Sequence, residues 1–581
     1  GNMKSILRVL FCTLLIATIF SCKKAGNGKV NIVNALLTAK IDTLDPAVSY
    51  DAVSGTVVYQ VYESLFEYHY LKRPYTLQEN LAASQPTVEN NGLRYIFTIK
   101  KGIPYHDHPV FNGKPRYVKA EDFLTAIKRQ AFVPTRGQGY FLFEGRVKGI
   151  GKFRKDAGSD FGKFESLPIE GFNVIDDQTF SLDLTKPYPQ LLYAFAMAFT
   201  APIPLEVIKY HKNDISSVMV GTGPFYLEKW DRNLQVMLKR YPKYRNVLYP
   251  SNGDRHANAS GMLSDANKKI PFLMGIKFNI IKEPNPRWLK FRKKEIDYLR
   301  IPKDNFATAI TGTGTLSPEL KKEGIQLQIA PTLTTWWMAF NMEDQVVGTN
   351  KNLRMAIAHA IDTDKFINLF TNNVGLSANS IYAPGVPGYS PTITQPFKFD
   401  LDIAKDYLKK AGFEDGKGLP TITYDTRTNN AVERQMSEFF KTQLLHIGVD
   451  LKVSINNYPG FLEKMRNGNL QFWRGGWTLD YPDGENLLQL LITQNKAPKG
   501  INDAMYSNPK FDALFEKLKV LPNGTEKYQI MKEMEETMQE DLPWAMLYYR
   551  RGYNLNHGYL KNYRPSDLIN NYFKYLRLEP R

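Results

Sequence analysis

The stretch FWRGGWTLDYPDGENLL, from Phe472 to Leu488, joins a pair of glycines to a large aromatic side chain and an aspartate. Gly475 and Gly476 have no side chains, so another extended chain could approach their backbone closely and hydrogen-bond to it. Trp477 adds a wide apolar wall beside them. The stretch therefore predicts a segment that holds a ligand.

The carboxylate in this stretch belongs to Asp480, which stands between Leu479 and Tyr481. A carboxylate among apolar neighbours usually needs a cation or several hydrogen-bond donors to offset its desolvation, and a free ammonium group would serve. The alternative is an edge strand that ends in a Tyr-Pro-Asp-Gly turn, in which Asp480 caps the turn or accepts backbone N–H groups. Both interpretations stay open on the pattern alone.

The size and charge of the chain limit its class. Its 581 residues are too many for one ordinary core, and this length predicts about three to four domains. The 75 basic and 58 acidic residues give a net charge of +17. The basic residues are scattered, and no arginine-rich tail or nucleic-acid-binding motif occurs. The charge therefore indicates a solvated basic surface, and no nucleic-acid partner is expected.

The start of the chain has the pattern of a secretory signal. Lys4 and Arg8 precede the apolar run Val9 to Phe20, which is too short to cross a bilayer, because a spanning helix needs about 20 residues. Both cysteines of the chain, Cys12 and Cys22, lie in this region. The rest of the chain can therefore form neither an internal disulfide nor a cysteine metal site.

The end of the signal, Ile19-Phe20-Ser21-Cys22, resembles the lipobox of bacterial lipoproteins. This resemblance implies a signal peptide over residues 1–21 and lipidation of Cys22. Residues 22–28 would then be a tether between the lipid and the folded protein.

Alternating and helical patterns follow one another along the chain and predict a mixed α/β architecture. Strands are expected near 30–44, 93–102, 176–184 and 451–456, and a hairpin over 221–240 that turns at Asp231-Arg232-Asn233. Helices are expected from Val57 to Phe66 and over 119–130, 353–361, 402–413, 433–449 and 526–541.

Other short motifs carry little chemistry. Gly221-Thr222-Gly223-Pro224 lacks the lysine and the helix of a phosphate loop, so it predicts a tight turn before a strand. His106 and His108 would share one face of a strand and could bind a metal, but such isolated pairs are usually loop residues. No Gly-x-Ser-x-Gly or His-Glu-x-x-His motif occurs, although a scattered triad stays an open alternative. No catalytic residue, metal or cofactor is therefore predicted.

Six parts of the chain together carry a family resemblance. They are VYESLFEY (Val61 to Tyr68), YIFTIKKGIPYHD with the later VKAEDFLTAIKR, GTGPFYLEKW, LRMAIAHAIDTDKF (Leu353 to Phe366), GWTLDYPD and DLPWAMLYYR (Asp541 to Arg550). In this order and spacing they resemble the extracytoplasmic solute-binding proteins of ABC transporters, specifically the oligopeptide- and dipeptide-binding family, family 5. The similarity spans nearly the whole mature chain.

The resemblance implies a two-lobed α/β fold of the class II periplasmic type, with an extra subdomain in the first lobe. Lobe I would contain residues 29–70, 185–328 and 542–581, the extra subdomain 71–184 and lobe II 329–541. A ligand would be enclosed between the lobes by hinge closure.

The resemblance also implies which residues bind the ligand. In peptide-binding members an aspartate after Gly-Trp-x-x pairs with the α-ammonium of the ligand, which on this chain is Asp480. Backbone groups at Gly476 and Thr478 would pair with the peptide as an added strand, beside the wall of Trp477. Arg474 resembles an arginine that meets the carboxylate of a short peptide, with a solvated surface arginine as the alternative.

The segment APTLTTWWMAFN, from Ala330 to Asn341, resembles the part of the family that crosses into the second lobe, where aromatic residues line the cleft. Trp336 and Trp337 are therefore candidate ligand contacts. The alternative for either ring is a place in the core.

The expected function is a receptor, not an enzyme: a lipoprotein of the cell envelope that captures di- or oligopeptides and delivers them to the transmembrane subunits of an ABC permease. The protein is expected to be a monomer in the periplasmic or extracytoplasmic space, anchored to the membrane. One alternative is a receptor for another solute such as a metal chelate, with His106 and His108 as the first candidates. The other is a secreted hydrolase or an adhesin on the same fold.

Overall fold

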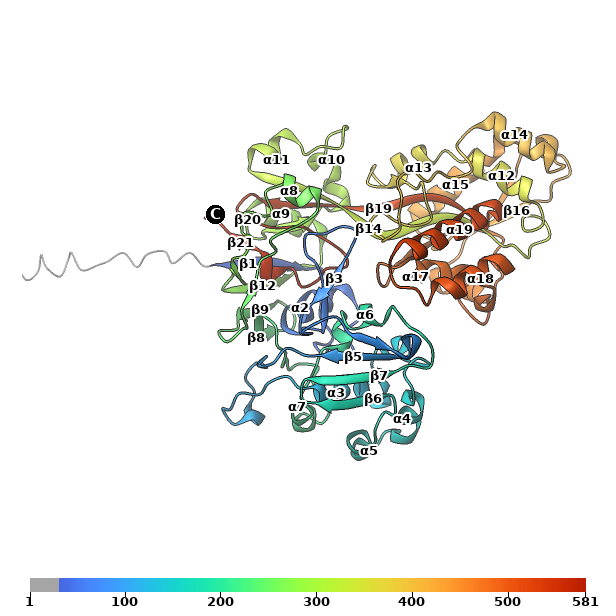
Figure 1. The fold of residues 1–581 in the computed structure, drawn as a ribbon. Helices are drawn as coiled ribbons and strands as arrows, with labels where there is room; N and C mark the ends of the chain where they lie inside the picture. Colours follow the sequence, from blue (N-terminus) through green and yellow to red (C-terminus); the bar gives the residue numbers. More distant parts are fainter. Residues whose placement is uncertain (1–30) are drawn as a thin grey trace, which may run out of the picture.

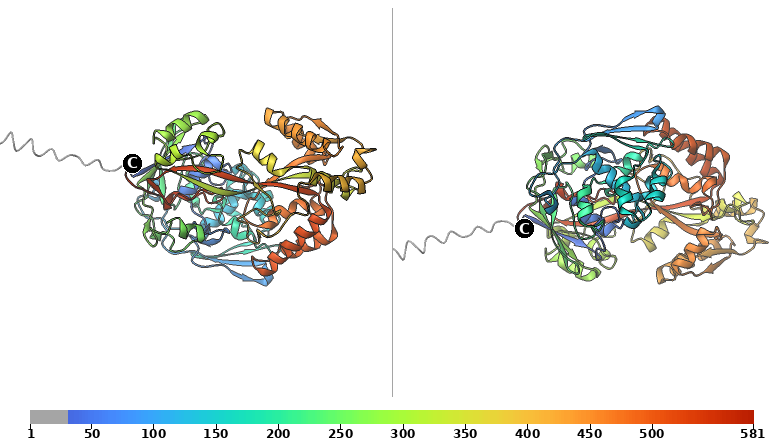
Figure 2. Two further views of the ribbon diagram at one scale, coloured as in Figure 1. Left: turned by 90° about the horizontal axis from the view of Figure 1, so that it is seen from above. Right: turned by 90° about the horizontal axis from the view of Figure 1, so that it is seen from below.

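Two long antiparallel strands, β14 (Ile325–Phe340) and β19 (Trp544–His557), connect two α/β units (Figure 1). The computed structural model describes residues 31–581, so the expected signal peptide, Cys22 and the tether lie outside the described residues. The left view of Figure 2 shows the red strand β19 passing from one unit to the other. Their register shifts between Pro331 and Thr335, and again between Trp336 and Trp337, so the regular ladder is interrupted midway.

The first unit, lobe I, contains a four-stranded sheet in the order β1-β12-β9-β8. Its strands are β1 (Ile32–Leu37), β12 (Gly275–Ile280), β9 (Gln235–Arg240) and β8 (Phe225–Asp231). Residues of β1 alternate between buried and partly buried, as expected for a strand with one face on a core. The predicted N-terminal strand and the predicted hairpin are both confirmed.

The predicted helix from Val57 to Phe66 is wrong at its end. Helix α2 (Ala52–Val61) is capped by Asp51, whose side chain accepts from the backbone N–H of Ser54, and stops at Val61. Residues Phe66–Tyr68 instead form strand β2, which pairs with β3 (Leu77–Glu79). At this point the backbone of Gly221 and Gly223 packs directly against Val61, where a side chain on either glycine would overlap it.

The extra subdomain is a second four-stranded sheet with helices packed on it. The sheet order is β4-β5-β7-β6. Its elements are β4 (Thr87–Glu89), β5 (Arg94–Thr98), β7 (Thr179–Asp183), β6 (Phe172–Asp176), α3 (Ala120–Ala131), α4 (Ile150–Ala157) and α5 (Phe161–Ser166). The predicted strands at β5 and β7 and the predicted helix at α3 are confirmed.

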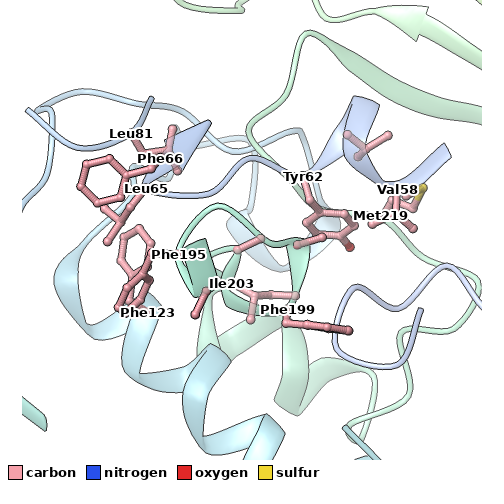
Figure 3. Packing of buried hydrophobic residues seen from close by; sticks show 14 of the residues in the cluster. Val58, Tyr62, Leu65, Phe66, Leu81, Phe123, Phe195, Phe199, Ile203 and Met219 are labelled. Carbon is pink, nitrogen blue, oxygen red and sulfur yellow. The ribbon is translucent and has the colours of Figure 1, made fainter. Parts of the chain in front are cut away.

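One hydrophobic core joins the extra subdomain to lobe I (Figure 3). Phe123 of α3 and Phe195 pack in the same cluster as Val58 of α2, Tyr62 directly after this helix, and Phe66 of β2. Because these side chains are all buried, the extra subdomain is attached to lobe I through a continuous apolar contact rather than a linker.

The second unit, lobe II, is built on the sheet order β14-β18-β16-β17, beside β19. Its elements are β18 (Phe472–Thr478), β16 (Ile422–Asp425), β17 (Leu451–Ser454), α12 (Lys351–Ala360), α13 (Thr363–Phe370), α14 (Leu401–Lys410), α15 (Ala431–Leu445), α16 (Tyr458–Arg466), α17 (Gly484–Leu488), α18 (Pro509–Leu518) and α19 (Thr525–Asp541). The four later helices and the strand predicted from the sequence are confirmed at α12, α14, α15, α19 and β17.

Shorter elements complete the two units. They are α6 (Leu191–Ala194), α7 (Leu205–Tyr210), β10 (Val247–Leu248), α8 (Arg255–Ala259), β11 (Lys269–Ile270), α9 (Pro284–Arg292), β13 (Tyr298–Arg300), α10 (Phe306–Ala309), α11 (Pro318–Lys322), β15 (Leu376–Ser377), β20 (Leu560–Lys561) and β21 (Arg577–Leu578). The expected lobe boundary between residues 328 and 329 falls inside β14, since this strand belongs to both units. The division into ranges stays a prediction.

Two tryptophan–glycine pairs connect β14 to β18. Trp336 lies opposite Gly476 and Trp337 lies opposite Gly475 in the antiparallel ladder. A Cβ on Gly475 would lie 2.5 Å from Trp337 Nε1, and a Cβ on Gly476 would overlap the Trp336 ring. The glycines therefore make room for the two indoles, a structural role that the sequence interpretation did not include.

We expect Gly475→Ala to lower the free energy of unfolding by about 1–3 kcal/mol, since overpacking a core costs this much. The Trp337 ring cannot move away easily, because it is buried and stacks on Trp544 with ring centroids 4.0 Å apart. Urea titration followed by tryptophan fluorescence measures the change. Gly312→Ala is the matched control, because a Cβ there meets no atom within 4 Å. Equal stability of the two variants would contradict this account.

Candidate ligand-binding site

Strand β18 has one paired edge and one open edge along the predicted site. Strand β16 pairs only with the first two residues of β18, as far as Trp473, and no other described strand covers that edge. The carbonyl of Arg474 points to the open edge, because Arg427 Nη1 donates to it at 3.1 Å. Alternate residues of a strand direct their backbone groups to the same side. The N–H and C=O groups of Gly476 and Thr478 therefore face the open edge too.

Asp480 lies just beyond the end of β18 and is held by neutral donors. Its Oδ1 accepts from the Tyr50 hydroxyl at 3.2 Å, and its Oδ2 accepts from Asn486 Nδ2 at 3.2 Å. The amide oxygen of Asn486 accepts from the Asp480 backbone N–H at 3.1 Å and from Trp477 Nε1 at 2.9 Å. Asn486 thus fixes both the carboxylate and the indole. Within residues 31–581, no Lys, Arg or His nitrogen lies within 4.0 Å of this carboxylate.

The alternative in which Asp480 caps the following turn does not hold. The N-cap of α17 is Asp483, whose side chain accepts from the backbone N–H of Glu485 at 3.0 Å. Asp483 also forms a buried ion pair with Lys527 at 2.6 Å. The local structure therefore does not need Asp480 as a cap, and its carboxylate stays available.

A cavity of about 250 Å³ lies between Asp480 of lobe II and residues of lobe I. Five carboxylates line it: Asp51, Glu63, Glu67, Asp480 and Asp567. The partners of the other four are Ser54 for Asp51, Arg245 for Glu63, Lys574 for Glu67 and Arg300 for Asp567. Asp480 and Asp51 are the acids in this wall whose donors all lack a positive charge. Asp51 also caps helix α2, so we expect a cationic ligand group to meet Asp480.

An aromatic wall from lobe I stands beside Asp480. Tyr50 is 58% exposed, and its ring stacks on Phe199 at 5.6 Å and meets the edge of Phe141 at 6.5 Å. Partial burial of the hydroxyl and the nearby charge of Asp480 raise the pKa of Tyr50 to about 12. The hydroxyl is therefore protonated at neutral pH and donates to the carboxylate.

Arg474 lies in neither of the two expected environments. Its side chain is 5% exposed, donates to Glu433 Oε1 at 2.5 Å and lies 4.3 Å above the Trp336 ring. It is not a solvated surface arginine, and its charge is already neutralised by Glu433. The expected contact between Arg474 and a ligand carboxylate is therefore not available in this arrangement.

Arg427 is the guanidinium that sequence reasoning missed. It lies 5.2 Å from the Trp336 ring and 4.9 Å from the Phe461 ring, at the open edge of β18. No carboxylate oxygen of the described residues lies within 4.0 Å of its nitrogens. Burial lowers the pKa of Arg427 from its usual value. A partly buried guanidinium without a carboxylate partner is suited to an anionic ligand group.

The candidate tryptophans differ in exposure. Trp337 is 3% exposed and stacked on Trp544, which places it in the core, the alternative kept open for this ring. Trp336 and Trp477 are partly buried. The Arg427 guanidinium lies over the Trp336 ring. Trp477 Nε1 donates to the Asn486 side chain, which also contacts Asp480.

The histidine pair does not converge on a metal position. His106 is 2% exposed and its Nε2 lies 2.8 Å from the carbonyl of Gly223, and burial lowers its pKa to about 4. His108 Nε2 lies 2.8 Å from His211 Nε2. Across residues 31–581, no group of three or more His, Cys, Asp or Glu side chains is placed to hold a metal ion.

The missed residues could not be found from local patterns. Tyr50 and Arg427 lie in loops without a distinctive motif, and Asn486 lies inside the quoted stretch but has no pattern of its own.

No helix in the described part of the chain has the length and apolar character needed to span a bilayer.

Comparison with solved structures identifies the fold. A peptide-bound DppA of Helicobacter pylori, solved with the peptide STSA, superposes with a TM-score of 0.65 at 23% identity, covering 94% of this chain and 98% of that chain. HbpA2 of Haemophilus parasuis gives a TM-score of 0.76 at 21% identity, covering 94% and 100%. The predicted two-lobed periplasmic-binding-protein fold is confirmed.

Comparison of sequences identifies the family. The chain is 25% identical over 538 residues to the oligopeptide-binding protein OppA of Bacillus subtilis, covering 91% of this chain and 89% of that protein. It is 22% identical over 505 residues to a dipeptide-binding protein of Escherichia coli, covering 85% and 84%. The model of the family described as bacterial extracellular solute-binding proteins, family 5, matches residues 76–499. The chain therefore belongs to family 5 of the bacterial extracellular solute-binding proteins.

Proposed function

We propose that this protein is a peptide receptor that encloses a di- or oligopeptide between its lobes and delivers it to an ABC permease. The observation that carries the proposal is the open edge of β18, which ends at a carboxylate without a cationic partner. In this proposal the α-ammonium of the peptide binds Asp480. The peptide backbone then pairs with Gly476 and Thr478 as an added strand.

This arrangement accounts for capture without a fixed side-chain sequence. Main-chain hydrogen bonds give affinity to any peptide, while Asp480 sets the register by holding the N-terminus. The names of relatives support this class of ligand, since they include an oligopeptide-binding and a dipeptide-binding protein. Receptors for other solutes are a weaker alternative, because His106 and His108 are each engaged within the protein.

The opposite end of the edge suits an anionic group. Asp480 and Arg474 are six positions apart, which corresponds to about 20 Å along an extended strand at ~3.3 Å per residue. The Arg427 side chain donates to the carbonyl of Arg474 and lacks a carboxylate partner. We infer that Arg427, and not Arg474, meets the carboxylate of a peptide of about six residues.

The first test concerns Asp480. We expect Asp480→Ala to weaken binding of a peptide with a free N-terminus by about 30-fold or more, since removing one partner of a charge pair shielded from water costs roughly 2–5 kcal/mol. Acetylated peptides should bind wild type poorly and the variant equally poorly. Isothermal titration calorimetry of both peptides with both proteins gives the coupling between carboxylate and ammonium.

Asp567→Asn is the matched control for this cycle. Asp567 lines the same cavity, but its carboxylate pairs with Arg300 at 3.1 Å, so the variant should retain discrimination against acetylated peptides. Strictly additive effects of acetylation and Asp480→Ala would exclude recognition of the ammonium by Asp480. Mass spectrometry of peptides recovered from the protein separates a receptor from a hydrolase, since a hydrolase would return cleaved products.

A second test concerns Arg427. Arg427→Gln should weaken binding of a hexapeptide with a free C-terminus by about tenfold or more, because hydrogen bonds to charged groups are worth about 1.5–3 kcal/mol. The amidated hexapeptide should bind both proteins alike. The same calorimetric cycle measures this, and an equal loss for both peptides would show that Arg427 acts only through packing on Trp336.

We also propose that Cys22 carries a lipid that anchors the receptor to the membrane. The proposal rests on Ser21-Cys22 at the end of a short apolar run. Cys22→Ala should move the expressed protein from the membrane fraction to the soluble fraction, since lipid insertion would no longer hold it. Fractionation after a salt wash checks this, with Cys12→Ala as the control. Retention of the Cys22 variant in the membrane fraction would contradict lipidation at this residue.

A further inference from the structure

The loop that carries Asp480 also touches lobe I outside the cavity. Tyr481 directly follows Asp480, and its ring stacks on Tyr193 of α6 with the centroids 5.4 Å apart and the planes 9° apart. Both side chains are buried. Figure 1 shows α6 close to α17, which begins just after this loop. A buried aromatic stack therefore joins the two lobes beside the proposed peptide anchor.

Polar contacts reinforce this stack. Gln190, directly before α6, donates through Nε2 to Asp483 Oδ2 at 3.3 Å, and Lys527 of α19 donates to the same oxygen at 2.6 Å. Asn523 Nδ2 donates to the Tyr193 hydroxyl at 3.3 Å. Gln190, Asp483 and Lys527 are all buried. Separating the lobes here would leave buried polar groups without partners, so this contact is costly to open.

The other half of lobe II has no such attachment. Among the described residues, no hydrogen bond, ion pair or aromatic ring contact joins residues 391–470 to residues 31–330. The apolar cluster around α12, α14 and α15 lies entirely within residues 336–548. Tyr481 instead shares its apolar cluster with Tyr193 of lobe I. The attachment of lobe II to lobe I is therefore uneven, strong beside α17 and lacking at α14, α15 and α16.

This uneven attachment limits how lobe II can turn. Lobe II is held by the crossing strands β14 and β19 and by the contact around Tyr193. Tyr75, in the same apolar cluster, adds a bond from its backbone N–H to the Gly385 carbonyl at 3.3 Å. A rotation of lobe II displaces the residues near these attachments least. Asp480 is next to the Tyr193 contact, whereas α14 lies at the far end of lobe II (Figure 1).

We propose that the Tyr193 contact is a pivot that positions Asp480 on lobe I before a peptide arrives, and that lobe II closes by turning about it. The inference rests on the peptide receptor proposed above. The α-ammonium then meets a carboxylate that is already in place, while α14 moves towards lobe I. A preorganised anchor loses less freedom on binding. Tyr193 acts through Tyr481 and is a positioning residue.

Distances between spin labels in the full-length protein test the pivot. Both cysteines lie in the first 22 residues, so Cys12→Ser and Cys22→Ser confine the labels to introduced cysteines. Lys229→Cys in β8 is combined with Lys517→Cys in α18 or with Lys405→Cys in α14, and all three lysines are exposed. In the peptide-free protein the 229–517 distance should have a narrow distribution and the 229–405 distance a broad one. Saturating hexa-alanine should shorten the 229–405 distance alone.

Substitutions of Tyr193 test its positioning role. Tyr193→Ala should broaden the 229–517 distribution of the peptide-free protein, whereas Tyr193→Phe keeps the ring and should leave it narrow. By calorimetry, Tyr193→Ala should weaken binding of hexa-alanine by about fivefold or more, since Asp480 is then correctly placed in only a fraction of the molecules. N-acetylated hexa-alanine, which has no ammonium for Asp480, should lose less than about twofold.

Tyr210→Ala is the control for the loss of a tyrosine ring. Tyr210 belongs to α7 and is 55% exposed, so neither distance should change. Equal shortening of both distances by hexa-alanine, or a narrow 229–517 distribution in Tyr193→Ala, would overturn the pivot. An equal loss of affinity for free and acetylated peptide would overturn the positioning role. If no peptide binds to wild type, the receptor function fails, and the peptide-free distributions still decide whether the pivot exists.

Discussion

The pairing of β14 with β19 on one edge and β18 on the other is the constraint on which the rest of the structure depends. The two long strands carry the chain between the lobes, so the place where they enter lobe II fixes the position of β18. Gly475 and Gly476 hold that pairing close by making room for two indoles. As a result, the open edge of β18 and Asp480 lie where the lobes face each other.

The charged side chains around this edge fall into two groups: some form ion pairs within the protein, and others lack a partner of opposite charge. Glu433 neutralises Arg474, and Lys527 neutralises Asp483, in ion pairs whose members are all nearly buried. Removing one partner of a buried ion pair lowers the free energy of unfolding by about 3–5 kcal/mol. These pairs are therefore fixed parts of the fold. Asp480 and Arg427 lack such partners, and they lie at the two ends of the open edge.

Local pattern predicted most elements but not the contacts between them. The hairpin β8–β9 and helices such as α15 follow from alternation and amphipathic spacing. At the end of helix α2, Val61 packs against the backbone of Gly221, which is 160 positions away and has no local signal. The same limit applies to Arg474, whose environment depends on Glu433 of α15. Asp480 could be singled out because its apolar neighbours made the carboxylate locally unusual, whereas its donor Tyr50 comes from the other lobe.

The partial exposure of Asp480 explains why capture and closure belong together in the proposed mechanism. In contact with water, a charge pair at 4 Å is worth only about 1 kcal/mol, because water screens it. Closing the lobes around a peptide would remove that water and strengthen the same pair several-fold. A ligand without an ammonium group would leave the carboxylate desolvated and unpaired, which opposes closure. In the proposed mechanism, one carboxylate would therefore both anchor the correct ligand and disfavour closure around a wrong one.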